Sequence, residues 1–330
     1  MELEKPFGVI TACHRGDYFL VKATCASIRH FCGDVPVCVV VDGDFDVSEL
    51  VRTYNVRILR TRELPDRRMR ELCSGSARSK MAAMWVGPFE RYLYLDADAI
   101  FWGDVVSKVE WDEEDFLVFW PELTGPAERS WLTRFYFNVD QLLAFDPAFS
   151  WEWNTYFCTG AFAARRGAIT WDTWMRVENW WRNQPTMFSW TEDQGILNYL
   201  VFSKQQHGTL HVGRRDLQWI PEHGGIKETR LRFPSSLSTL PATVPNVSIL
   251  HFCGQKPHVH RLGAYSRNFT AARIHHYRRS LNKSGWFAIA AILREECLLI
   301  QERARRKISK LIGRFEEGVN ANAPTASNRI

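Results

Sequence analysis

Two carboxylates stand two residues apart at the end of an apolar segment, in residues 92–98 (YLYLDAD). Carboxylate oxygens are the ligands that hard divalent cations prefer, and these cations often complete their shells with phosphate oxygens of a substrate. Most such acidic pairs are only solvated turns. Here the preceding segment is apolar on both faces, which predicts a buried strand, and parallel sheets bind ligands beyond the carboxyl ends of their strands. We therefore predict that Asp96 and Asp98 bind a divalent metal ion.

A second candidate segment is found at residues 249–257 (ILHFCGQKP). His251 ends an apolar run, and a neutral imidazole is a competent metal ligand. Gly254 permits close approach of a ligand to the backbone, and Lys256 carries a point charge suited to phosphate. Alone, the segment is more typical of a strand that ends in a satisfied core histidine. Combined with the aspartate pair, it predicts a third metal ligand and a countercharge for a diphosphate.

A third polar group, Thr191-Glu-Asp193-Gln194, precedes the apolar residues 195–201. One interpretation is the start of a helix, because a threonine cap and acidic side chains stabilise a helix N-terminus. The other interpretation is a functional site that uses Asp193 and Gln194. The spacing of these residues is compatible with both.

The elements that must position these residues alternate between strand and helix over the first hundred residues. Apolar runs predict strands at 7–12, 37–41, 56–59 and 91–95, and apolar positions three or four apart predict helices at 18–32 and 76–85. This alternation predicts an α/β protein with a parallel, doubly wound sheet. Further along, we expect strands at 116–120, 159–164 and 248–252, and helices at 172–181 and 195–201.

Length and composition exclude several classes of protein. The 330 residues are 45% apolar and 24% charged, which is normal for a folded chain and argues against global disorder. The net charge of +5 is uneven, because the segment from residue 261 onward holds 14 Lys and Arg against 5 Asp and Glu. The first 260 residues are slightly acidic, so we expect no nucleic-acid partner.

The eight cysteines and the N-terminal residues indicate the cellular compartment in which we expect the protein. No two cysteines form a CxxC pair, which disfavours a zinc site, and several lie in apolar runs where a thiol packs as a small hydrophobic group. The N-terminal MELEKP is charged, and the apolar run after it is too short for a secretory signal. The longest apolar run, residues 286–293, is far shorter than the ~20 residues that span a bilayer. We therefore expect a reduced, cytoplasmic protein.

Four segments taken together resemble the nucleotide-sugar glycosyltransferases of the GT-A fold: FGVITACHRGDY, YLDAD, TEDQGILNYL and HFCGQKP. Their order and separation most resemble family 8, the retaining glycogenin and lipopolysaccharide galactosyltransferase group, over about residues 5–260. The resemblance implies a Rossmann-like, mostly parallel sheet flanked by helices. It also implies transfer of a hexose from a UDP-sugar, with retention, to a glycan, lipid-linked or protein acceptor.

The resemblance also assigns roles to individual residues. It implies that Asp96, Asp98 and His251 hold Mn²⁺ or Mg²⁺ on the donor diphosphate, and that Asp193 and Gln194 lie beside the anomeric carbon. Glutamine is a poor nucleophile, so the resemblance favours front-face substitution without a covalent intermediate. The implied nucleotide-sugar contacts are Thr11, Ala12, His14, Tyr18, Asp42, Lys80, Ala97, Gly254 and Lys256.

The sequence departs from the family pattern at two places. Family 8 commonly shows HFxGxxKPW, whereas here Gly254 and Lys256 are one residue closer together and His258 stands in place of Trp. The family's NxG segment is Cys158-Thr159-Gly160 here, without the Asn that contacts the sugar. Family 8 itself and a divergent GT-A branch therefore both stay open.

Two other classes of function compete with this one. Phosphatases of the haloacid dehalogenase type also carry DxD after an apolar strand, with the first Asp as nucleophile. Their usual Thr after the pair is absent here, where Ala99 and Ile100 follow, and three strands precede the motif. A non-catalytic sugar-binding module is the other alternative, and it would need no nucleotide pocket.

The sequence after residue 260 differs in composition from the part before it and predicts a separate extension. We expect a glycosyltransferase domain at 1–260, a basic helical extension at 261–318 and a disordered tail at 319–330. Apolar residues at helical spacing form one stripe within 286–315: Ile289, Leu293, Cys297, Ile300, Ala304, Ile308, Leu311 and Phe315. Such a stripe beside basic residues predicts a helix on the anionic inner face of a membrane. Packing of the stripe on the catalytic domain is an equally open alternative.

Overall fold

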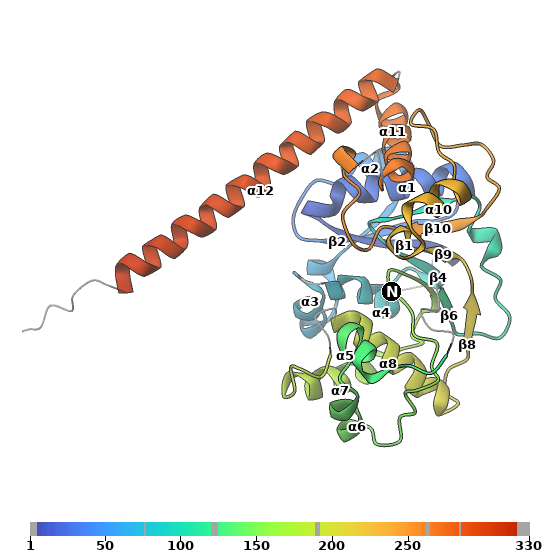
Figure 1. The fold of residues 1–330 in the computed structure, drawn as a ribbon, viewed down its shortest axis with the longest axis vertical. Coiled ribbons are helices and arrows are strands. Elements are labelled where there is room, and N and C mark those ends of the chain that lie inside the picture. Colours follow the sequence, from blue (N-terminus) through green and yellow to red (C-terminus); the bar gives the residue numbers. More distant parts are fainter. Residues whose placement is uncertain are drawn as a thin grey trace, which may run out of the picture.

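The computed structural model describes residues 5–75, 77–119, 125–188, 192–261, 265–283 and 285–321. At its centre is a seven-stranded sheet in the order β3-β2-β1-β4-β7-β6-β8 (Figure 1). Only β7 runs antiparallel to its neighbours. The strands are β1 Lys5–His14, β2 Val37–Asp42, β3 Arg57–Arg60, β4 Phe89–Asp96, β6 Phe116–Phe119, β7 Ala161–Arg165 and β8 Val212–Arg215. The prediction of an α/β fold with a mostly parallel sheet is confirmed, although β7 interrupts the parallel order.

A second, three-stranded sheet has the order β5-β10-β9, formed by Ala99–Trp102, Ser248–His251 and Gln218–Trp219. In this sheet β10 runs antiparallel to β5, with His251 opposite Ala99. The strand β5 begins directly after the Asp96–Asp98 turn, so this pairing carries His251 to that turn from a distant part of the chain. The register of the small sheet therefore assembles the candidate metal ligands.

Apolar side chains cover both faces of the central strands. Val9 and Ile10 are neighbours in β1 and belong to two different hydrophobic clusters, both fully buried. The same alternation holds in β2, whose residues 37–41 are all buried. An uninterrupted apolar run is therefore required here, because both faces of the strand are covered by helices.

The helices agree with the sequence where amphipathic periodicity is long. The main helices are α1 Tyr18–Cys32, α2 Ser48–Tyr54, α3 Arg67–Cys73, α4 Ala82–Val86, α5 Arg129–Phe135, α6 Val139–Phe145, α7 Trp171–Arg182, α8 Glu192–Gln206, α9 Pro221–Gly224, α10 Ile226–Arg232, α11 Arg267–Leu281 and α12 Gly285–Ala321. The helix predicted at 76–85 is confirmed only in its second part, α4, because the residues before it, Ala77–Met81, form a 3₁₀ helix. Residues 76, 120 and 191 of the predicted segments lie outside the described residues.

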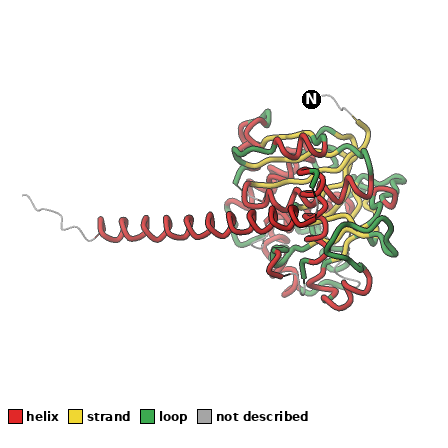
Figure 2. The backbone as a smooth tube through the Cα atoms, turned by 90° about the horizontal axis from the view of Figure 1, so that it is seen from above, coloured by secondary structure: helices red, strands yellow, loops and turns green. Residues whose placement is uncertain are grey.

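Two helices close the chain, and α11 packs against both α1 and α12. A buried polar cluster joins them: Arg273 of α11, only 1% exposed, pairs with Glu295 and Glu296 of α12. Lys22 of α1 also pairs with Glu295, at 3.1 Å. Beyond these contacts α12 runs away from the body (Figures 1 and 2). No helix among the described residues is both long and apolar enough to cross a bilayer.

The division of the chain at residue 260 stays a prediction. The helix α12 continues to Ala321, and the remainder of the expected disordered tail, residues 322–330, lies outside the described residues.

Glu296→Gln is expected to lower the stability of the fold and to change its acid sensitivity. Burial raises the pKa of Glu296, but the hydrogen bond with His258 and the charge of Arg273 outweigh it and bring the pKa from 4.5 to about 2. The ionised carboxylate therefore stabilises the fold above pH 4.5, and this contribution is lost as the pH falls toward 2. We expect a cost of about 2 kcal/mol at neutral pH, because Arg273 keeps Glu295 as a partner.

Denaturant unfolding at several pH values measures this effect. The difference between the wild type and Glu296→Gln should shrink as the pH falls from 4.5 toward 2. A difference that stays constant over this range would contradict the assignment.

Candidate active site

Three strands of the large sheet end together at the candidate site. The last residues of β1 and β2, His14 and Asp42, stand opposite each other, and Ala12 stands opposite Asp96 at the end of β4. These are the carboxyl ends of neighbouring parallel strands, where α/β sheets bind their ligands. The aspartate pair therefore lies at the expected edge of the sheet.

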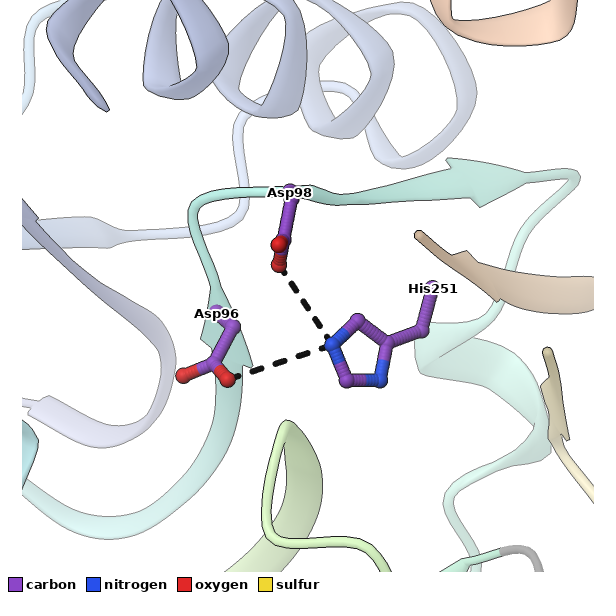
Figure 3. A group of neighbouring side chains, drawn as sticks. All are labelled: Asp96, Asp98 and His251. Atoms are coloured by element: carbon purple, nitrogen blue, oxygen red, sulfur yellow. Dashed lines mark ion pairs between the residues drawn. The ribbon is translucent and has the colours of Figure 1, made fainter. Parts of the chain in front are cut away.

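Asp96, Asp98 and His251 form one cluster (Figure 3). One ligand atom from each residue lies within 4.8 Å of the others. The His251 Nε2 atom is 3.4 Å from Asp98 Oδ1 and 3.9 Å from Asp96 Oδ2. Two carboxylates and one imidazole are a donor set that suits a divalent cation such as Mn²⁺ or Mg²⁺. The three ligands predicted from distant parts of the sequence thus lie around one point.

The surroundings of His251 suit a metal ligand. Its second nitrogen, Nδ1, is 2.7 Å from the side-chain amide of Gln218, and both residues are buried. In the described structure Gln218 Oε1 has no hydrogen-bond partner. The Gln218 atom at 2.7 Å is the amide nitrogen Nε2. Exchange of the amide oxygen and nitrogen would let Gln218 accept a hydrogen bond from Nδ1–H, and the His251 Nε2 lone pair could then bind a metal ion in place of its contact with Asp98.

The ring of His251 also requires a glycine beside it. A Cβ atom built on Gly160 would lie 2.0 Å from the imidazole carbon Cε1, so any larger residue would displace the ring. The Cys158 Sγ atom lies 3.7 Å from Nδ1 on the same side of the site. The segment that replaces the family's NxG therefore lies against the histidine.

The charges in the cluster act strongly on one another. Burial raises the pKa of Asp98, but the hydrogen bond with His251 and the charge of Lys256 outweigh it and hold the pKa well below its usual range. The Lys256 Nζ atom lies 2.7 Å from Asp98 Oδ2. Although Lys256 follows Gly254 one residue earlier than in the family pattern, it still reaches the aspartate turn.

A second buried lysine joins the metal cluster to α8. Lys80 is 5% exposed, and its Nζ atom lies 2.8 Å from Asp193 and 3.3 Å from Asp96. Burial lowers the pKa of Lys80, but the charges of Asp193 and Asp96 outweigh it and raise the pKa above its ordinary value. The Thr159 hydroxyl also donates to Asp193, at 3.1 Å. Lys80 therefore holds the two carboxylates in one arrangement.

A hollow of about 750 Å³ opens beside these residues, a volume within the range of small-molecule sites. The predicted site residues that line it are Ala12, His14, Asp42, Lys80, Asp96, Ala97, Asp98 and Lys256. Thr11, Tyr18 and Gly254 do not line this hollow, and Thr11 is fully buried inside β1. Eight of the fourteen predicted site residues thus line one hollow, and His251, Asp193 and Gln194 do not line it.

Gln194 lies in the first turn of a helix, as the helix-start interpretation expects. Its amide donates to the backbone oxygen of Phe135, at 3.1 Å, and it lies in the first turn of α8. Asp193, its neighbour, is engaged with Lys80 instead. The structure therefore brings Asp193 to the cluster and ties the Gln194 amide to α5.

Three neighbours of the cluster were not predicted from the sequence. The Tyr94 hydroxyl donates to Asp96 at 2.8 Å, and Gln218 and Thr159 act as described above. Tyr94 could have been found, because residues two apart in a strand lie on the same face and Tyr94 precedes Asp96 by two. Thr159 lies in the Cys158-Thr159-Gly160 segment that the resemblance marks, but its contact with Asp193 was not predicted, and no local pattern marks Gln218.

Gln218→Leu is expected to weaken binding of a divalent ion about 10- to 100-fold, the usual effect of removing the group that orients a ligating histidine. Leucine has a similar volume, so the β9–β10 pairing should persist. Titration of the purified protein with Mn²⁺ as the probe, followed by electron paramagnetic resonance, measures the affinity. Gln218→Glu keeps an acceptor and serves as the control. Equal affinity in the wild type and both variants would show that the amide has no part in the site.

Comparisons with known proteins support the fold. No family model matches the chain, and no curated protein matches it. A solved structure of an active-site mutant of LgtC matches with a TM-score of 0.50 and 15% identity, covering 80% of this chain and 94% of that chain. LgtC, described as a galactosyltransferase, in complex with donor and acceptor sugar analogues matches with a TM-score of 0.49, 16% identity and the same coverage. The glycosyltransferase GlyE of Streptococcus pneumoniae TIGR4 matches at 0.49 and 13%, covering 89% of this chain and 64% of that chain.

The arrangement of strands and helices defines the type of fold. The central sheet and its helices have the GT-A type of α/β fold, and the chain resembles LgtC over most of the length of both chains. The prediction of this fold from four short motifs is therefore confirmed.

Proposed function

We propose that this chain is a metal-dependent hexosyltransferase that uses a UDP-linked sugar as donor. The observation that carries the proposal is the convergence of Asp96, Asp98, His251 and Lys256 beside one hollow, at the carboxyl edge of a GT-A type sheet. Two oxygen ligands, one imidazole and a nearby ammonium group match the needs of a metal-bound diphosphate.

The proposed chemistry begins with stabilisation of the leaving group. Asp96, Asp98 and His251 would hold Mn²⁺ or Mg²⁺, which supplies a Lewis acid for the charge that develops on the departing diphosphate. Lys256 has a partly exposed side chain at the hollow, so its ammonium group adds positive charge on the same side. The strand ends at Ala12, His14 and Asp42 would receive the nucleoside.

The opposite charge grows on the sugar ring, and Asp193 would stabilise it. Lys80 binds Asp193 and Asp96 together, so it fixes the distance between the carboxylate of α8 and the metal cluster. Since Asp193 is only 5% exposed and paired, we propose front-face substitution with retention, without a covalent intermediate on this residue.

The acceptor is proposed to be a glycan, a lipid-linked sugar or a protein. Cys158 stands where the family pattern has the sugar-contacting Asn, and it contacts His251, while the next residue, Thr159, donates to Asp193. We therefore expect donor choice to differ from that of the family. A cytoplasmic location is also a proposal, and it does not depend on this site.

The competing functions predict different ligands. In a phosphatase Asp96 would be a free nucleophile, whereas here its carboxylate accepts from Tyr94 and contacts Lys80. A sugar-binding module would need neither the metal cluster nor a nucleotide pocket.

Thermal unfolding with UDP, GDP and Mn²⁺, each alone and in combination, tests the proposal. We expect UDP with Mn²⁺ to raise the melting temperature more than either alone, and GDP with Mn²⁺ to raise it less. Asp98→Asn should remove the joint effect. A melting temperature that responds to no nucleotide, with or without metal, would overturn the proposal.

A further inference from the structure

The apolar stripe of α12 is exposed. Trp286 is 82% exposed, Leu293 49%, Ile300 60% and Ile308 56%, and Cys297 between them is also exposed. The open alternative, in which the stripe packs on the body, is therefore wrong for these residues. Large apolar side chains that form one continuous exposed face indicate a binding surface.

The face of α12 beside the stripe packs against the body. Ala288 and Ile292 are buried against α11, and Glu296 is held by Arg273 and His258. These contacts lie at the start of the helix, and Figures 1 and 2 show the remainder running past the body. The helix is thus clamped on one side while its apolar side faces outward.

The spacing of the stripe disfavours a left-handed coiled coil. Ile289, Ile300 and Leu311 are eleven residues apart, and Leu293, Ala304 and Phe315 repeat the same interval. At 3.6 residues per turn an eleven-residue repeat drifts only about 20° round the helix, in the sense opposite to a heptad. A left-handed helix pair with a second copy needs a heptad, so the eleven-residue spacing disfavours that pairing.

Positive charge gathers where the stripe begins. Thr239, His275, Arg278, Arg279, Asn282 and Lys283 line a hollow of about 730 Å³, and no carboxylate is among them. Burial is the main cause that lowers the pKa of His275 to about 4, and the charges of His30, Arg279 and Arg278 lower this pKa further. Arg278 also lines a second hollow together with Trp286 and Ile289. Arg278 therefore joins the cationic hollow to the beginning of the apolar stripe.

We propose that the stripe and the cationic hollow together bind the surface of an anionic lipid bilayer. The helix lies in the plane of the surface with Ile289, Leu293 and Ile300 inserted among the acyl chains. The hollow at Arg278, Arg279 and Lys283 receives lipid phosphate groups. Exposed Arg294 and Arg305 add positive charge along the helix. The inference depends on α11 and α12 alone and not on the proposed catalytic activity.

Flotation of the full chain with lipid vesicles tests this inference. We expect binding to phosphatidylcholine vesicles that contain phosphatidylglycerol, weaker binding as salt increases, and little binding to phosphatidylcholine alone. Replacing Arg278, Arg279 and Lys283 by Gln should lower partitioning on the order of 100-fold, since each charge near the surface contributes about fivefold. Leu293→Glu with Ile300→Glu should abolish binding.

Matched controls separate the surface from general effects. Leu298→Glu changes an equally exposed leucine that lies about 140° round the helix from Leu293, and it should bind normally. Lys108→Gln removes an exposed charge elsewhere and should also bind normally. Far-ultraviolet circular dichroism shows whether each variant keeps its helices.

Two outcomes would overturn the inference. One is flotation that does not depend on the surface: either the wild type does not float with anionic vesicles, or the variants with the stripe and hollow substitutions float as well as the wild type does. The other is a wild-type dimer in sedimentation velocity that Leu293→Glu with Ile300→Glu dissociates, without vesicle binding, because the stripe would then be an interface between two copies.

Discussion

Asp98→Asn is expected to lower metal-dependent sugar transfer by at least about 100-fold, and to lower the melting temperature as well. The carboxylate is 4% exposed and lies between His251 and Lys256, so the substitution removes one ligand charge from the centre of the cluster. Asparagine keeps the shape and one oxygen acceptor, but it lacks the charge that pairs with His251 and Lys256, so the fold also loses stability. Steady-state rates at saturating Mn²⁺ and donor measure the loss.

Asp172→Asn is a suitable control, because Asp172 is an exposed aspartate in the first turn of α7. Its rate should match that of the wild type. A full rate for Asp98→Asn, or an equal loss in the control, would remove the basis of the metal site.

Asp193→Asn is expected to lower kcat by about 100-fold or more, while the KM for the donor changes only a few-fold. The reason is the role proposed for Asp193, which Lys80 holds at 2.8 Å: it would stabilise the positive charge on the sugar ring, an interaction that matters most in the transition state. Gln194→Ala should lower kcat less, because the Gln194 amide is already engaged with Phe135. Initial rates over a range of donor concentrations separate kcat from KM.

Unfolding measurements on the same variants decide between function and helix structure. Asp193→Asn leaves buried Lys80 with Asp96 as its remaining ion-pair partner, so a loss of stability is also expected. If both variants only lose stability and keep kcat, the group is simply a helix start. A loss in donor affinity equal to the loss in rate would instead indicate ground-state binding.

Much of the fold follows from local sequence patterns. The apolar periodicity of residues 18–32 gives the bounds of α1, and the β-branched run at 37–41 gives β2 almost completely. Both signals are strong because the helix buries one face and the strand buries two. The Asp96, Asp98 and His251 cluster was also predictable, since each residue stands at or just beyond the end of an apolar strand and the motifs resemble a known family.

Other features depend on contacts that no local pattern encodes. The strand β9 has only two residues, yet it brings Gln218 to His251 through pairing with β10. Lys80 lies in a 3₁₀ turn, and its partner Asp193 is far along the chain. In α12 the sequence shows the apolar stripe, but only the packing of its other face on α11 reveals that the stripe is exposed.

A screen of nucleotide sugars for Mn²⁺-dependent hydrolysis tests the central claim most directly. We expect release of UDP from one or a few UDP-hexoses, loss of this activity on chelation, and its return when Mn²⁺ is added. Nuclear magnetic resonance of the first sugar released should show the anomeric configuration of the donor. If no nucleotide sugar is cleaved with or without metal, while a phosphate monoester is hydrolysed, the chain is not the transferase proposed here.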